Sequence, residues 1–368
     1  MGVRVVVKVC LLLPDLRGGG AERVSLDLGH AFAALGHQVE FALMRRSGDF
    51  LAEAEAAFPV ADLAAPRVRQ VLPGLTAHLR RSRPDVVLAA MWPLTVLAQV
   101  AQRLSGHRCR VIVSEHGMLS AQYGTWGLGH RVMLRASTML GYRLADARVG
   151  VSAGVAADMA RLSGMAESRF AAIHNPLRRL ADPEVGQVAQ AEALWQGQGP
   201  RIVTVGSLKP VKNHALLLQA FARLPLPQAR LMIVGQGPEE GRLLQLVTEL
   251  GLGERVILAG FHADPAALYA TADLFALSSD HEGFGNVLVE ALSFGLPVVS
   301  TDCPAGPAEI LGGGRWGDLV PVRDAEALAA AMTAALSRSV NREALKARAA
   351  EFAPAIVARR YLGLVGLS

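Results

Sequence analysis

The chain has few cysteines and few aromatic residues, and both shortages exclude classes of protein. Its 368 residues include three scattered cysteines, Cys10, Cys109 and Cys303. They predict a reduced, cytoplasmic protein without a disulfide framework. Aromatic residues make up only 5% of the chain. Because arginine clusters such as Arg80-Arg81-Arg83 lack interleaved rings, we predict no nucleic-acid partner.

Long apolar runs are also missing. No uninterrupted stretch reaches the roughly 18 residues that a membrane-spanning helix needs. The longest candidate, Val86 to Ala101, is broken by Pro93 and polar residues and predicts a strand followed by a helix. Residues Met1 to Leu13 contain two basic residues and no convincing cleavage site, so we interpret them as a buried strand and not as a signal peptide.

Charge is unevenly distributed along the chain. Residues 1–180 hold 22 Lys+Arg and 13 Asp+Glu, whereas residues 181–368 hold 15 and 19. A basic first half predicts an anionic partner, such as an anionic membrane surface or a lipid-diphosphate acceptor. The alternative is that the arginines, 33 of the 37 cations, are simply solvated. A peripheral position on the inner face of the cell membrane therefore stays an open expectation.

Short apolar strands alternate with amphipathic helices throughout the chain. This alternation predicts α/β units with parallel sheets covered on both faces. A polar, glycine-containing stretch at residues 181–199 is interpreted as a linker, after which the pattern restarts. We therefore expect two Rossmann-like doubly wound domains, 1–180 and 200–354, that face a central cleft.

A carboxylate-bearing turn lies between a strand-like run, 273–277, and a helix-like run, 287–294. Glu282 opens the turn Gly283-Phe284-Gly285, and Glu290 follows eight positions later. Backbone N–H groups at a helix N-terminus can hold an anion. Two carboxylates around such a cradle suit a ligand that is both phosphorylated and rich in hydroxyl groups.

Two further loops follow predicted strands. Gly18-Gly19-Gly20 precedes a helix, where glycines allow a ligand to approach the backbone closely, although a simple tight turn is the alternative. Lys209 and Lys212 lie in another strand-to-helix loop, where an ammonium group suits a diphosphate, although most such lysines are solvated. Asp280-His281-Glu282 are adjacent and do not converge on one ion, and no motif requires a metal or other cofactor.

The block Glu282-Gly283-Phe284-Gly285 with Glu290, Gly295-Leu296-Pro297-Val298-Val299 and Glu309 resembles the nucleotide-sugar site of retaining GT-B glycosyltransferases. The bacterial glycosyl group 1 family is the most similar. The resemblance covers most of the chain, including Gly19 to Arg23 and Lys212. It implies a GT-B architecture with an N-terminal acceptor domain, completed by a C-terminal helix at 355–368, and a C-terminal donor domain.

The resemblance also implies roles for individual residues. Catalytic roles fall on Glu282 at the sugar hydroxyls, on Lys212 at the diphosphate and on His116, which ends a predicted strand, at the donor sugar. Glu290 would hold the ribose. The remaining donor-binding residues are Gly283, Phe284, Gly285 and Asn286 at the diphosphate, Ser207 and Lys209, and Phe261 and His262 near the base. Ser207 stands where the family usually has arginine, and Lys209 is the candidate to replace it. Gly18, Gly19 and Gly20 would face acceptor and diphosphate.

The resulting expectation is a retaining glycosyltransferase that moves a sugar from a nucleoside-diphosphate sugar, with UDP as the expected nucleotide, to a saccharide or lipid-linked acceptor. Two alternatives remain. One is a nucleotide-sugar 2-epimerase of the same fold, and the other is a non-catalytic nucleotide-sugar binding subunit, which the serine at position 207 would favour.

Overall fold

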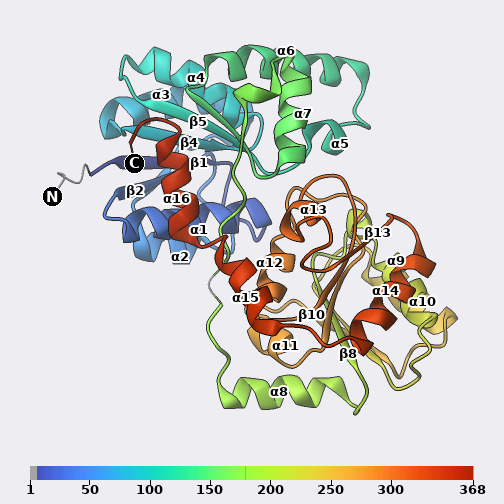
Figure 1. Cartoon of the computed structure of the whole chain (residues 1–368). Coiled ribbons are helices and arrows are strands. Elements are labelled where there is room, and N and C mark those ends of the chain that lie inside the picture. The colour runs from blue at the N-terminus through green and yellow to red at the C-terminus, as the bar shows by residue number, and fades with distance from the viewer. Residues whose placement is uncertain (1–5, 179, 368) are drawn as a thin grey trace. The chain divides into compact units, whose positions relative to one another are not determined.

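The computed structural model describes residues 6–178 and 180–367. The chain forms two compact units (Figure 1). Unit 1 contains the residues up to Pro176 together with those from Phe352 onward, and unit 2 is Leu177–Glu351. Each unit is built around its own parallel sheet, so two doubly wound α/β units are present, as the alternation of strands and helices predicts.

Unit 1 contains a parallel sheet with the strand order β3-β2-β1-β4-β5-β6-β7. The apolar runs of its central strands are almost fully buried, which is typical of a sheet covered by helices on both faces. Its strands are β1 (Lys8–Leu13), β2 (Gln38–Leu43), β3 (Val60–Asp62), β4 (Val86–Ala90), β5 (Arg110–Glu115), β6 (Ala147–Gly150) and β7 (Ala171–Ala172).

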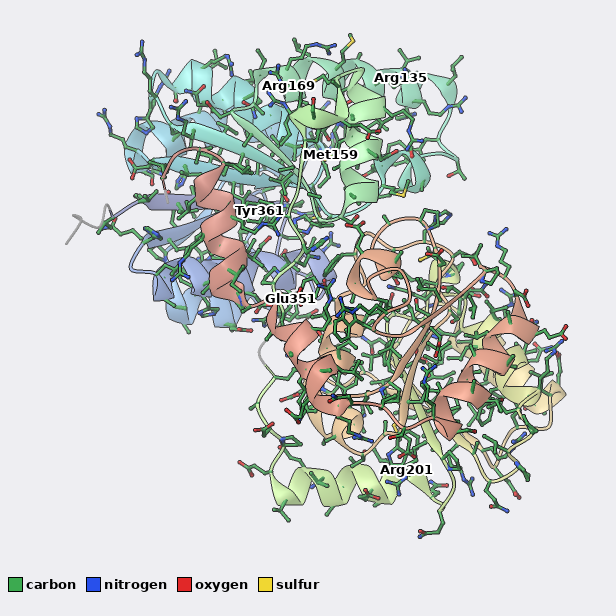
Figure 2. The ribbon with its side chains drawn as sticks, viewed as in Figure 1. Arg135, Met159, Arg169, Arg201, Glu351 and Tyr361 are labelled. Carbon is green, nitrogen blue, oxygen red and sulfur yellow. The ribbon has the colours of Figure 1, made fainter. Side chains whose placement is uncertain are left out.

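Helices connect these strands, and one comes from the far end of the chain. Tyr361 on the C-terminal helix is fully buried among core residues of unit 1 (Figure 2). The helices of unit 1 are α1 (Gly20–Ala34), α2 (Leu51–Ala57), α3 (Val71–Ser82), α4 (Leu94–Ser105), α5 (Leu119–Gln122), α6 (Leu128–Leu144), α7 (Ala153–Ser163) and α16 (Pro354–Gly363), with short 3₁₀ turns η1 (Val68–Gln70) and η2 (Glu167–Arg169).

Unit 2 contains a second parallel sheet, ordered β10-β9-β8-β11-β12-β13. Its strands are β8 (Arg201–Val205), β9 (Arg230–Val234), β10 (Val256–Gly260), β11 (Leu274–Leu277), β12 (Val298–Thr301) and β13 (Asp318–Val320). Its helices are α8 (Val185–Trp195), η3 (Pro210–Lys212), α9 (His214–Ala222), α10 (Glu240–Glu249), α11 (Ala266–Ala270), α12 (Asn286–Ser293), α13 (Pro307–Ile310), α14 (Ala325–Ser337) and α15 (Arg342–Ala350).

Some expected bounds differ from the observed ones. The stretch 181–199, interpreted as a linker, contains helix α8. The helix packs on unit 2 because Trp195 is fully buried and its indole Nε1 donates to Thr271 Oγ1 at 3.0 Å. The expected first strand included residues 1–5, and the expected last helix included residue 368. These six positions lie outside the described residues.

Candidate functional site

The site of unit 2 begins at the point where its sheet topology reverses. β8 and β11 are neighbours, and the chain proceeds from β8 toward one edge of the sheet and from β11 toward the other. At such a switch point the loops after the two strands diverge and leave room for a ligand at the strand C-termini. The loop after β8 carries Lys212, and the loop after β11 carries Glu282.

The structure brings Lys212 and Glu282 together across this point. Lys212 Nζ donates to Glu282 Oε1 at 2.6 Å, and Ser279 Oγ donates to the same oxygen at 2.7 Å. The Glu282 side chain is largely buried, whereas that of Lys212 is partly accessible. Because an ammonium group has three N–H donors, Lys212 keeps capacity for an anionic ligand while it is paired.

Further hydrogen bonds join the two loops. Asp280 N donates to Val211 O at 2.8 Å, and Asn213 Nδ2 donates to Asp280 Oδ1 at 3.0 Å. Arg323 pairs with the other oxygen of Asp280. Partial burial raises the pKa of the Asp280 carboxyl, but the hydrogen bonds from Arg323 and Asn213 outweigh it and the pKa is lowered. Asp280 and Glu282 therefore have separate partners.

The Gly283-Phe284-Gly285 turn leads directly into α12. Gly285 is the N-cap residue and has a left-handed backbone (φ 98°, ψ 53°), which glycine adopts without steric cost. Gly306 approaches the turn closely: a Cβ atom there would lie 1.9 Å from Phe284 O. The Phe284 side chain is buried in the core, so only its backbone is suited to face a ligand.

Glu290 lies one turn into α12, whereas Glu282 lies before the helix, because residues 282–285 are not helical. Its carboxylate is buried, and Oε2 accepts a hydrogen bond of 2.9 Å from Tyr269 Oη. Burial and the neighbouring Glu290 raise the pKa of Tyr269 well above its ordinary value, so the phenol remains a donor. Tyr269 also stacks on Phe294, which holds its ring in place.

His214 begins α9 directly behind the lysine loop. Its side chain is 4% exposed, and neither ring nitrogen makes a hydrogen bond of normal geometry within the described residues. Burial lowers its pKa to about 4, and the nearby Lys212 acts in the same direction. The imidazole is therefore neutral at pH 7 and adds no charge beside Lys212.

Other expected donor residues make their described contacts within their own loops. Lys209 is exposed at the start of η3, and Ser207 O accepts the N–H of Lys209 at 2.8 Å. Phe261 is 62% exposed after β10, which is an outer strand of the sheet. His262 Nε2 contacts Ala259 O at 3.2 Å, which keeps the ring against its own loop.

The glycine-rich loop of unit 1 follows β1 and ends at the N-cap of α1. Gly18 N donates to Asp49 Oδ2 at 3.2 Å. The buried Asp15 forms ion pairs with Arg17 at 2.9 Å and with Arg45 at 2.7 Å. The loop follows the strand that lies at the switch point of the first sheet, between β4 and β2, so its position fits a ligand-facing role.

Glu115 and His116 follow one another at the end of β5. Glu115 is buried and accepts hydrogen bonds from Trp92 N, Thr95 Oγ1 and Tyr142 Oη at 3.1, 2.8 and 2.7 Å. Burial raises its pKa to about 7, although these donors act in the opposite direction. Burial lowers the pKa of His116 to about 4, so His116 is neutral at pH 7.

A third polar cluster lies inside unit 1. Cys10, Glu40 and His78 are buried together, with Glu40 Oε1 at 3.1 Å from His78 Nε2. Lys8 Nζ lies 3.1 Å from Glu40 Oε2, so a protein cation already pairs with this carboxylate. Burial raises the pKa of Cys10 well above its ordinary value, which keeps the thiol protonated.

Sequence reasoning did not find Ser279, Tyr269, Asn213 or His214. Ser279 lies three positions before Glu282 and could have been found from that proximity. Tyr269 is separated from Glu290 by 21 residues and a strand, so no local pattern connects them.

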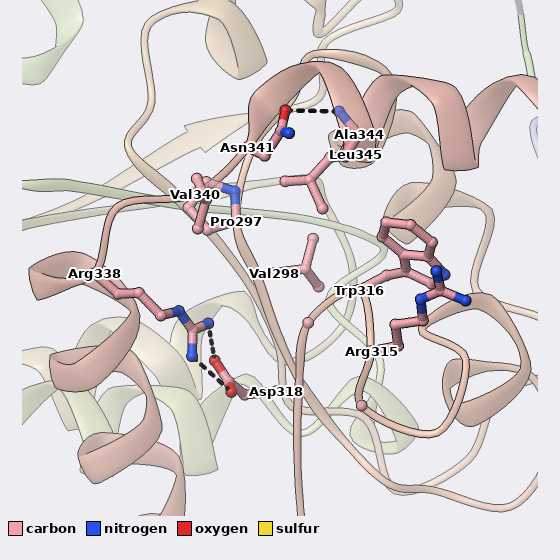
Figure 3. Close-up of a pocket in the computed structure, with 12 residues that line it drawn as sticks. Pro297, Val298, Arg315, Trp316, Asp318, Arg338, Val340, Asn341, Ala344 and Leu345 are labelled. Carbon is pink, nitrogen blue, oxygen red and sulfur yellow. Dashed lines mark hydrogen bonds and ion pairs between the residues drawn. The ribbon is translucent and has the colours of Figure 1, made fainter.

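One hollow of unit 2 does not belong to this site. Pro297, Val298, Trp316 and Asp318 line it, together with Asn341 at the start of α15 (Figure 3). Val298 and Asp318 are the first residues of β12 and β13, so the hollow lies at the N-terminal ends of the strands. The ion pair between Asp318 and Arg338, at 2.8 Å, occupies its rim.

Two Rossmann-like parallel sheets, each with a topological switch point, are typical of the GT-B fold, and solved structures agree. HepE from Anabaena, crystallised with UDP and glucose, matches with a TM-score of 0.80 at 22% identity, over 98% of this chain and 99% of that one. The apo form of the lipopolysaccharide outer core galactosyltransferase WaaB matches with a TM-score of 0.75 at 18% identity, over 97% and 99%.

Sequence comparison identifies the family. The glycosyl transferases group 1 model matches residues 188–352, and the glycosyltransferase family 4 model matches residues 18–178. N-acetylgalactosamine-N,N'-diacetylbacillosaminyl-diphospho-undecaprenol 4-alpha-N-acetylgalactosaminyltransferase of Campylobacter jejuni is 32% identical, over 67% of this chain and 66% of that protein. The lipopolysaccharide core biosynthesis glycosyltransferase LpsE of Rhizobium meliloti is 28% identical, over 91% and 89%. The chain belongs to the group 1 glycosyltransferases and is a glycosyltransferase of GT-B fold.

Within the described residues, no helix combines the length and the apolar character needed to cross a membrane.

Proposed function

We propose that the protein transfers a sugar from a UDP-sugar to a saccharide or lipid-linked acceptor with retention of anomeric configuration. The observation that carries the proposal is the contact between Lys212 and Glu282 at the switch point of the second sheet. The contact brings Lys212, a cation suited to a diphosphate, beside Glu282, a carboxylate suited to sugar hydroxyls. The relatives named for N-acetylgalactosamine transfer to a diphospho-undecaprenol carrier and for lipopolysaccharide core synthesis support the acceptor class.

In this proposal unit 2 binds the donor. Glu290, held by Tyr269, accepts hydrogen bonds from the ribose hydroxyls, and Glu282 accepts from the sugar hydroxyls. We assign the backbone of the turn at 283–286 to the diphosphate, because the N-terminus of a helix such as α12 favours an anion. Phe261 and His262 lie beside the base, and Lys209 assists Lys212 where Ser207 replaces the usual arginine.

Unit 1 binds the acceptor. Gly18, Gly19 and Gly20 face acceptor and diphosphate, and the neutral His116 contacts the donor sugar. In the reaction the bond between the anomeric carbon and the leaving phosphate oxygen breaks, and the acceptor oxygen bonds to the same face of that carbon. The acceptor proton passes to the leaving phosphate. Lys212 and the backbone donors stabilise the negative charge that develops there, and preorganised donors of this kind are a large catalytic term.

A nucleotide screen followed by a product assay tests the proposal. UDP and UDP-sugars should raise the melting temperature of the purified protein more than the corresponding GDP and ADP compounds, because a ligand of the folded state stabilises it. Incubation with the best UDP-sugar and a set of saccharide and lipid-linked acceptors should give an α-linked product from an α-linked donor. A free epimer without transfer, or a β-linked product, would contradict the proposal.

A further inference from the structure

Helix α6 of unit 1 exposes several large apolar side chains to solvent. Leu128, Val132 and Leu140 are 70%, 58% and 61% exposed, and Met133 and Met139 are exposed as well. The side that packs on α4 and α7 carries Leu134, Thr138, Gly141 and Tyr142. In water each exposed apolar side chain forgoes the stabilisation that burial would supply, so this row indicates a partner.

The row continues beyond the helix. Trp126, just before α6, is 42% exposed and forms edge-on contacts with Tyr123 at 4.6 Å and His130 at 5.1 Å between ring centroids. Six large apolar side chains therefore face solvent over residues 126–140, which form the apolar face of α6: Trp126, Leu128, Val132, Met133, Met139 and Leu140. Contiguous exposed apolar surface of this kind marks an interaction site.

The charge beside the apolar face has one sign. No Asp or Glu occurs between Glu115 and Asp146. Arg131 and Arg135 are exposed on α6 and form no ion pair with any other described residue, and Arg135 lies at the outer boundary of unit 1 (Figure 2). Arg143, by contrast, is engaged with Met139 O and Ser163 O. Two cations are thus available beside the apolar face.

We propose that this face is a membrane-binding surface for an anionic phospholipid bilayer. An amphipathic helix with arginines beside exposed leucine, methionine and tryptophan lies in the plane of the headgroups, with its apolar side chains among the acyl chains. Arg131 and Arg135 would then reach lipid phosphates, and Trp126 would occupy the interface, where aromatic rings of this type collect. Binding does not require the donor chemistry proposed above, since it involves only residues between 126 and 140 of unit 1.

Vesicle co-sedimentation without donor or acceptor tests the surface. Vesicles of phosphatidylglycerol and phosphatidylcholine should bind the protein, and vesicles of phosphatidylcholine alone should bind it at least tenfold more weakly. The double variant Leu128→Ser/Leu140→Ser should lose roughly tenfold or more in binding, because both side chains would leave the acyl region. Arg131→Gln/Arg135→Gln should lose roughly tenfold or more and should show a weaker salt dependence.

Matched controls separate the surface from general charge and hydrophobicity. Leu244→Ser removes a leucine of α10 that is 50% exposed, and Arg69→Gln/Arg81→Gln removes two exposed arginines elsewhere in unit 1. Both controls should bind vesicles like the unchanged protein. The tryptophan fluorescence should shift to the blue on vesicle binding, and Trp126→Phe should abolish most of this shift. A Trp126 that only packed within the protein would not produce such a shift.

Two results would overturn the proposal. One is equal binding by the α6 variants and the controls. The other is a stable dimer in solution that dissociates in the Leu128→Ser/Leu140→Ser variant without any affinity for vesicles, since a second copy would then cover the face. An unchanged unit 1 transition in scanning calorimetry, measured in the same preparations, shows that the α6 variants are folded. Unchanged UDP affinity keeps failure of this proposal distinct from failure of the proposed glycosyl transfer.

Discussion

At the residue scale, the site of unit 2 depends on pairs of side chains that come from different loops. Glu282 is mostly buried and has Lys212 and Ser279 as partners, and Glu290 is buried with Tyr269 as a partner. A buried charge without a partner is costly, so each of these partners also keeps its carboxylate in place. Single substitutions should therefore separate binding from turnover.

Lys212 should contribute more to turnover than to donor binding. Charge that develops on the leaving phosphate interacts with its ammonium group, so Lys212→Ala should lower kcat by about 100-fold or more. Lys209→Ala should have a smaller effect, because Lys209 is exposed at the start of η3, and Ser207→Arg should partly compensate for it.

Initial rates against donor concentration check this expectation. The matched control is Lys346→Ala, which removes an exposed lysine of α15 paired with Glu343 and should leave the rates unchanged. Near-normal turnover in Lys212→Ala together with a large loss in Lys209→Ala would mean that the two lysines exchange roles.

Glu290 should determine affinity for the nucleotide. Glu290→Gln should weaken UDP binding by about 1–3 kcal/mol, the range for hydrogen bonds to a charged group. Tyr269→Phe should weaken it by about 0.5–1.5 kcal/mol, because it removes one neutral donor that orients the carboxylate. Isothermal titration with UDP measures both. Undiminished UDP affinity in a folded Glu290→Gln protein would contradict the assignment of Glu290 to the ribose.

His214 should make the free energy of unfolding depend on pH. Its pKa falls from 6.5 to about 4 on folding because burial disfavours the charged form. The unfolded chain therefore binds a proton that the folded chain does not, and stability should fall as pH drops from about 6.5 to about 4. His214→Gln should reduce this loss by about 1–3 kcal/mol. Urea unfolding at pH 4 and pH 7 checks the slope, and an unchanged slope would contradict the burial argument.

At the scale of elements, the turn before α12 depends on its neighbour at Gly306. Gly306 has φ 96°, and a Cβ there would overlap the carbonyl of Phe284. Gly306→Ala should therefore destabilise the protein by more than about 1 kcal/mol and displace the 283–285 turn. UDP affinity should fall with it.

The matched control is Gly253→Ala, where an added Cβ meets nothing within 4 Å. Melting temperature and UDP affinity of the two variants are the measurements. Equal behaviour of Gly306→Ala and Gly253→Ala would show that the turn tolerates the substitution and that its position does not depend on Gly306.

At the scale of the whole molecule, the last helix belongs to the first unit. Tyr361 on α16 is fully buried in the core of unit 1, and its hydroxyl lies 3.1 Å from Ser114 Oγ. The core of unit 2 is a separate cluster. Tyr361→Ala should destabilise unit 1 by about 3–5 kcal/mol, the range for removing a large buried ring.

Scanning calorimetry with and without UDP should resolve the effect. UDP should raise the transition of unit 2, and Tyr361→Ala should lower the other transition. The conservative variant Tyr361→Phe should cost only about 0.5–1.5 kcal/mol, the value of one hydrogen bond. If Tyr361→Ala lowered only the transition that UDP raises, α16 would stabilise unit 2 instead.

Much of the fold could be predicted from local pattern. Alternation of buried strands and amphipathic helices follows from residues close in sequence, so the two parallel sheets and the turn at 283–285 were accessible from the chain alone. The polar composition of residues 181–199 predicted a linker, but the stretch contains α8. Trp195 anchors this helix through a hydrogen bond to Thr271. That contact joins residues 76 positions apart, and no window of sequence contains both.

The sequence by itself determined which loops follow strands and carry glycine, lysine and glutamate, because these depend on short-range spacing. Tertiary structure alone decided that Lys212 meets Glu282, since β8 and β11 are neighbours in the sheet although β9 and β10 separate them in the chain. It likewise decided that α6 turns its apolar side chains to solvent. Periodicity shows which residues share a helix face, but only the packing of the neighbouring helices shows which face remains uncovered.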